Sequence, residues 1–103
     1  MNESSSAKLW INKTPIELKP FVEDFLVKVT IGVVKPLKGV DYIRNIELIH
    51  EYEDLKVLVN KEDIPITPFP YTIITSTIIG LLSTLKGAGD IKSFDVNVEV
   101  RPD

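Results

Sequence analysis

The chain repeats itself, because residues 48 positions apart match in one register without gaps. Between residues 9–48 and 57–96, eleven of the forty aligned pairs are identical. The longest identical runs pair Pro20-Phe21 with Pro68-Phe69 and Leu37-Lys38-Gly39 with Leu85-Lys86-Gly87. The match predicts an ancestral unit of about 48 residues present twice. Two copies are too few for a solenoid or a propeller, so we expect one domain with a pseudo-twofold axis.

Each repeat is predicted to form a short strand pair, a helix and a closing strand. The helices are expected at 20–37 and 68–85, since a proline begins each and the first helical turn needs no amide donors. Closing strands are expected at 43–50 and 93–100, the second with strict apolar and polar alternation. The sequence therefore predicts an α+β fold, (ββαβ)₂, with an antiparallel or mixed sheet and two helices on one face. A ferredoxin-like arrangement, with the short hairpin strands merged into their neighbours, is the alternative.

The strand pairs are expected to turn at Lys13-Thr14 and at 61–63, each after an asparagine, which tolerates the left-handed backbone that such turns require. Residues 1–6 are expected to form a disordered tail. Residues 7–103 then make a single domain of two repeats, at about 8–50 and 56–101.

Composition limits the classes of function. The chain has no cysteine, which excludes disulfides and thiolate chemistry. Its net charge is −3, and no basic stripe is visible, so nucleic acid is a disfavoured partner. The uncharged segment 64–85 carries three prolines in its first third, and the remaining helix of about 24 Å is too short to span a bilayer. We therefore expect a cytoplasmic protein without a membrane partner.

No catalytic motif can be assembled from the chain. The single histidine, His50, lies in the charged run 50–54, which we expect to be a solvated linker between the repeats rather than a metal site or a base. A nucleophile, a base and oxyanion donors cannot all be assigned. The sequence predicts a protein that is not an enzyme and holds neither a metal nor another cofactor.

The second helix carries the candidate interface. Its outer stripe contains no charge, whereas the equivalent stripe of the first helix holds Asp24, Lys28 and Lys35. An uncharged stripe with a central isoleucine is typical of a packed interface, although a helix buried deeper in its own domain would look the same. The candidate interface residues are Thr72, Ser76, Ile79 and Ser83.

Two further features concern the helices. Gly32 and Gly80 occupy equivalent positions inside them, where glycine costs about 1 kcal/mol relative to alanine. We expect a close backbone approach at both. Phe69 is expected to pack at the start of the second helix.

The pattern Ile-Asn-Lys-x-Pro-Ile-x-Leu-x-Pro-Phe-Val at 11–22, followed by Leu-Lys-Gly-Val at 37–40, resembles a group of small archaeal proteins of unknown function. That group has Asn-Gly where this chain has Asn-Lys in both copies, and the second copy departs further at Pro70 and Ala88. The resemblance implies no activity. It implies only that one unit can stand alone in relatives and pair with itself.

The predicted function is a non-enzymatic protein-interaction or self-association module, acting through the second helix or through an open sheet edge. The partner is then a second copy or another protein. The alternative is a small-molecule or nucleotide-binding domain with its site between the two pseudo-symmetric halves. A nucleic-acid accessory protein that uses the sheet face is a third hypothesis.

Overall fold

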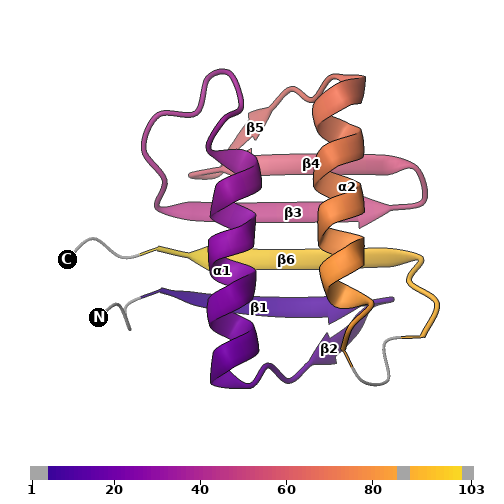
Figure 1. Ribbon diagram of the computed structural model, residues 1–103. Helices are drawn as coiled ribbons and strands as arrows, with labels where there is room; N and C mark the ends of the chain where they lie inside the picture. The colour runs from indigo at the N-terminus through magenta and orange to yellow at the C-terminus, as the bar shows by residue number, and fades with distance from the viewer. Residues whose placement is uncertain (1–4, 86–88, 101–103) are drawn as a thin grey trace.

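A computed structural model describes residues 5–85 and 89–100 of the chain, and its two layers are a six-stranded sheet and two helices that cover one face of it (Figure 1). The predicted α+β class, with both helices on one face, is confirmed. Every element of the second repeat begins and ends 48 residues after its counterpart. The strands are β1 (Ser6–Ile11), β2 (Thr14–Ile16), β3 (Asn45–Glu51), β4 (Asp54–Val59), β5 (Glu62–Ile64) and β6 (Ser93–Glu99), and the helices are α1 (Pro20–Val34) and α2 (Pro68–Leu82).

The two repeats are interleaved in the sheet. The strand order is β2-β1-β6-β3-β4-β5, and every neighbouring pair is antiparallel. The closing strands β3 and β6 lie at the centre and pair with each other, and each also pairs with the first strand of the other repeat. The pseudo-twofold axis therefore passes between β3 and β6. The ferredoxin-like alternative does not form, because β2 and β5 remain separate edge strands.

The core lies between the sheet and the helices. Along β3 and β6, every second side chain is buried on the helix-facing side, as the predicted alternation requires. Each fully buried aliphatic side chain of this kind stabilises the fold by about 1.5–3 kcal/mol. The innermost residues include Leu9, Leu26, Val34, Ile46, Leu48, Ile74, Ile78, Leu82, Phe94, Val96 and Val98. In the described part of the chain, the opposite face of the sheet carries no helix (Figure 1).

Both helices end three residues earlier than predicted. Pro36 follows the end of α1, because proline cannot donate the hydrogen bond that would extend the helix. After α2, the hydroxyl groups of Ser83 and Thr84 donate to the carbonyls of Ile79 and Leu81, and such local bonds compete with helix propagation.

Two boundary findings concern the rest of the chain. Strand β1 begins at Ser6, inside the segment expected to be a tail, of which residues 1–4 lie outside the described part. Among the described residues, no helix has the length and apolar character that crossing a membrane requires.

Candidate functional site in the helix layer

The aromatic residue that follows the first proline of each helix is exposed. Phe21 on α1 is 73% exposed and Phe69 on α2 is 74% exposed. One turn later, Phe25 and Ile73 are 49% and 44% exposed, and the rings of Phe21 and Phe25 meet edge to face at 5.1 Å. The prediction that Phe69 packs at the helix start is wrong, since the side chain points away from the core. Both repeats therefore present a large apolar side chain to solvent at the same two positions.

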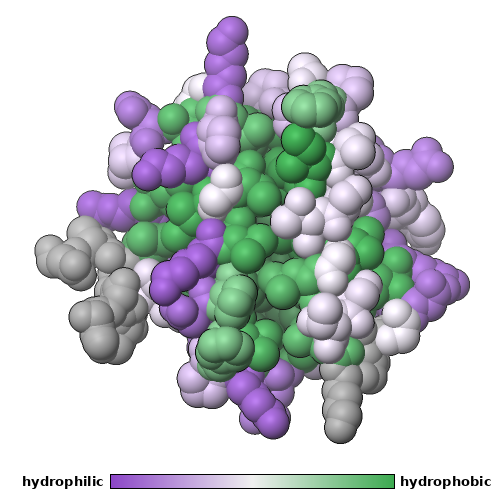
Figure 2. All heavy atoms as spheres, in the orientation of Figure 1, coloured by the Kyte–Doolittle hydropathy of each residue, from purple (hydrophilic) through white to green (hydrophobic). Residues whose placement is uncertain are grey.

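A groove of about 320 Å³ separates the end of α1 from the start of α2. Figure 2 shows a band of apolar side chains along the seam between the two helices, with most charged side chains at its margins. The wall on the α1 side and the wall on the α2 side are both apolar. The lining residues are Gly32, Val33, Pro36 and Leu37 on the first side, and Phe69, Pro70, Ile73 and Ile74 on the second.

The two helix glycines leave open space. A Cβ atom built at Gly32 or at Gly80 meets nothing within 4 Å, and both residues are exposed. The expected close approach of the backbone inside the domain is therefore wrong. Each glycine lowers helix stability, and no contact within the isolated domain requires it. The open space above it would let a partner molecule approach the helix backbone closely.

The predicted interface stripe lies beside this groove rather than in it. Thr72, Ser76 and Ser83 are exposed, whereas Ile79 is half-buried against the core, and none of the four lines the groove. The interpretation that the whole stripe is buried in its own domain therefore fails for the three hydroxyl residues. Thr72 Oγ1 donates to the Pro68 carbonyl at 3.1 Å, and Ser83 Oγ donates to the Ile79 carbonyl at 2.7 Å. Burying these two hydroxyl groups against a partner costs less free energy than burying unpaired hydroxyl groups, because their O–H donors already have acceptors.

Charge in the helix layer is scarce and mostly paired. Helix α2 contains no charged residue. On α1, the Lys28 ammonium is 3.0 Å from the Asp24 carboxylate, one turn away. Glu23 Oε2 accepts the backbone N–H of Ala7 in β1 at 2.9 Å. The face that the two helices present is therefore close to neutral.

His50 belongs to the core and not to a solvated linker. It is 6% exposed, lies in β3 and stacks on Phe94 of β6 with ring centroids 5.1 Å apart. Its charged neighbours form the tight β3–β4 hairpin, whose turn is Tyr52-Glu53. Burial lowers the pKa of His50, and in the described ranges 5–85 and 89–100 its Nδ1 atom has no hydrogen-bond partner. Within the part of the chain that the structure describes, no group of three or more His, Asp or Glu residues is placed to hold a metal ion.

Searches with family models, among curated proteins and among solved structures found no match to the chain.

Proposed function

We propose that the protein is a non-enzymatic self-association module in which two copies pack helix layer against helix layer about a twofold axis. The observation that carries the proposal is the equal exposure of Phe21 and Phe69, at 73% and 74%. A small domain that keeps the same large apolar side chain outside its core in both repeats has a surface suited to burial against a partner.

The apolar area is sufficient for a modest dimer. A phenylalanine buries about 150–250 Å² when it is covered completely, so Phe21, Phe25, Phe69 and Ile73 together offer roughly 400–500 Å² per copy. Two copies double this area, and the helix flanks between the four side chains add to it. The total approaches the ~1,200 Å² at which specific interfaces begin.

A second copy fits this face better than an unrelated partner, for two reasons. The pseudo-twofold axis places Phe21 with Phe25, and Phe69 with Ile73, at opposite ends of the helix layer, which gives a surface that complements itself after rotation. The face is also nearly neutral, so two identical copies meet without repulsion between like charges.

The other surfaces suit association less well. Each sheet edge is a strand of three residues; β2 contains Pro15, and β5 contains Glu62 and Asp63. Short edge strands with proline or charge resist pairing with another strand. The outer side of the central strands carries Glu47 and Asp95, an arrangement that repels the phosphates of nucleic acid.

The experiment is light scattering or sedimentation over a wide concentration range. The wild-type chain should form dimers. The double variant Phe21→Asp/Phe69→Asp should be a monomer, because it places two charges in an apolar contact while removing side chains that contribute little to the core.

Two equally exposed aromatics outside the helix layer provide the matched controls. Tyr42 is 66% exposed and Tyr52 is 82% exposed, in the loop before β3 and in the β3–β4 turn. Tyr42→Asp and Tyr52→Asp should leave the dimer unchanged. A wild-type chain that is monomeric at millimolar concentration contradicts the proposal, as does a double phenylalanine variant that still dimerises.

A further inference from the structure

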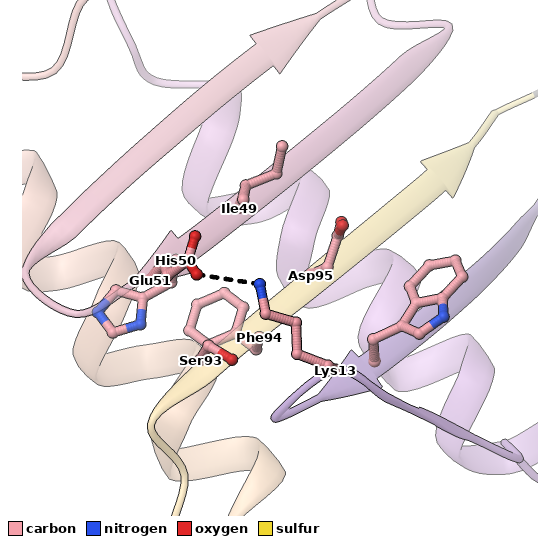
Figure 3. A pocket seen from close by; sticks show the side chains of 8 residues that line it. Lys13, Ile49, His50, Glu51, Ser93, Phe94 and Asp95 are labelled. Atoms are coloured by element: carbon pink, nitrogen blue, oxygen red, sulfur yellow. Dashed lines mark hydrogen bonds and ion pairs between the residues drawn. The ribbon is translucent and has the colours of Figure 1, made fainter.

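A second feature lies on the face of the sheet that α1 and α2 do not cover. A pocket of about 190 Å³ opens where the two repeats meet on the open face, and its polar walls are Lys13, Glu51 and Asp95. Figure 3 shows Lys13 reaching from the β1–β2 turn across the pocket, with its ammonium group between Glu51 and Asp95. Trp10 of β1 and Ile49 of β3 flank Asp95, because all three share one row of the sheet.

Asp95 is incompletely satisfied. Its Oδ1 atom is buried and has no hydrogen-bond partner among the residues that the structure describes. Burial between apolar neighbours raises the pKa of Asp95, the negative charge of Glu47 raises it further, and the ammonium of Lys13 lowers it. An unpaired buried carboxylate oxygen is costly, so a donor that reaches it gains more than an ordinary hydrogen bond.

Lys13 fills the pocket only loosely. Its Nζ atom donates to Glu51 Oε2 at 2.9 Å, but the Lys13 side chain is 74% exposed. An exposed pair of this kind contributes little to stability and exchanges readily. Glu51 and Asp95 bring two carboxylates to the single ammonium group of Lys13, which leaves the pocket negative.

The equivalent place in the other half of the molecule carries a different side chain beside its glutamate. A shift of 48 residues relates Ser93 to Asn45 and Glu51 to Glu99. The Asn45 amide nitrogen lies 3.2 Å from Glu99 Oε2 and 3.3 Å from Asn97 Oδ1, so a built-in N–H donor sits beside the carboxylate. At the pocket, the smaller Ser93 of β6 occupies the position equivalent to Asn45 and lines the cavity.

We infer that this pocket binds a small primary ammonium compound with a short apolar chain, whose ammonium displaces that of Lys13 and bridges Glu51 and Asp95. The apolar chain lies against Trp10 and Ile49, and the indole face adds a cation–π attraction. A pocket of 190 Å³ holds about six water-sized groups, which matches an amine of five or six heavy atoms. The negative lining excludes a nucleotide, whose phosphates would face Glu51 and Asp95. This site is independent of the proposed helix-layer association.

The test uses the single tryptophan of the chain, which lines the pocket. Butylammonium chloride is titrated at constant ionic strength, and the Trp10 fluorescence and the backbone amide shifts of Ser93 and Glu51 are followed. We expect saturable changes at both probes. The neutral 1-butanol and the anion butyrate should produce neither.

Variants in the two halves give a matched comparison. Asp95→Asn and Glu51→Gln should each weaken butylammonium binding by about tenfold, since each removes a charge-assisted hydrogen bond. Lys13→Met should tighten binding severalfold, because it removes the internal competitor and keeps the apolar stem. The equivalent changes Glu99→Gln and Lys61→Met should have no effect.

Three results would overturn the inference: a titration that does not saturate, an equal response to 1-butanol, or an equal loss in Glu51→Gln and Glu99→Gln. The last result would show attraction to a diffuse acidic surface rather than a pocket. None of these side chains belongs to the hydrophobic core, and unfolding curves of each variant confirm that loss of binding is not loss of fold.

Discussion

Asn12 and Asn60 make the same set of hydrogen bonds, each to the loop that precedes the closing strand of the other repeat. In each case the side-chain oxygen accepts two successive backbone N–H groups, and the side-chain nitrogen donates to a carbonyl two or three residues earlier. The bonded residues are Lys92, Ser93 and Asp90 for Asn12, and Arg44, Asn45 and Tyr42 for Asn60. The two asparagines therefore link the repeats by hydrogen bonds at both ends of the central strand pair β3–β6.

The side chain and the backbone of Asn60 should contribute separately to the free energy of unfolding. Its φ angle is 53°, which glycine accepts and alanine does not. Asn60→Gly should lower the free energy of unfolding by about 2 kcal/mol, since it removes three partly exposed hydrogen bonds. Asn60→Ala should cost about 1 kcal/mol more, because it adds left-handed backbone strain. Urea unfolding of both variants measures the difference, and equal stabilities would contradict the assigned strain.

Lys61 predicts a gain in stability from a single change. It follows Asn60 in the β4–β5 turn with a φ angle of 71°, and no side-chain hydrogen bond or ion pair of Lys61 is found among the described residues. Lys61→Gly should raise the free energy of unfolding by about 0.5–1 kcal/mol, because glycine relieves the strained backbone and loses part of that gain to its freedom in the unfolded chain. Thermal unfolding checks this. Lys61→Ala, which keeps a Cβ atom at the same φ angle, is the control and should show no gain.

The duplication was sufficient to predict the elements but not their partners. Local patterns at Pro20 and Pro68 mark the helices in both copies, and the alternation in 93–100 marks a strand with one buried face. Nothing local decides whether β1 pairs with the closing strand of its own repeat or with that of the other, because both have the same alternation. The interleaved pairing depends on contacts between distant residues such as Asn12 and Ser93.

The wrong predictions for His50 and Phe69 have local explanations. His50 stands beside carboxylates in and around a two-residue hairpin turn, and a short charged turn resembles a linker in sequence. Phe69 is a large aromatic residue after a helix-starting proline, where burial is the ordinary expectation. The sequence signal for an exposed position was the identity of Phe69 with Phe21. A core position would have accepted different apolar residues in the two repeats. That identity pointed to a shared surface.

Asp95 predicts a pH dependence of stability. Its pKa is raised in the folded chain, so between its ordinary value near 3.8 and the raised value the folded state binds more protons than the unfolded state. The contribution of Asp95 to stability is therefore highest at low pH and is lost as the pH rises through that window. The free energy of unfolding of Asp95→Asn, measured relative to that of the wild type, should increase as the pH rises from 3.5 to 7. Urea unfolding of both proteins across this range gives the difference, and a difference that shrinks with rising pH would contradict the assignment.

Gly80 connects the stability of the monomer with the proposed dimer. A Cβ atom at this position meets nothing within 4 Å, so Gly80→Ala should raise the free energy of unfolding of the monomer by about 0.5–1 kcal/mol through helix propensity alone. The same methyl group stands on the exposed face of α2, where a second helix layer would approach. We therefore expect Gly80→Ala to weaken self-association severalfold while it stabilises each copy.

Measuring both quantities separates the two effects. Unfolding in dilute solution reports on the monomer, and sedimentation at high concentration reports on the dimer. Thr77→Ala is the matched control, because it raises helix propensity at an exposed position of the same helix while removing atoms rather than adding them. Its dimer should be no weaker than that of the wild type. If Gly80→Ala stabilises the monomer and leaves the dimer intact, the helices do not approach at Gly80, and the contact is confined to the phenylalanine ends.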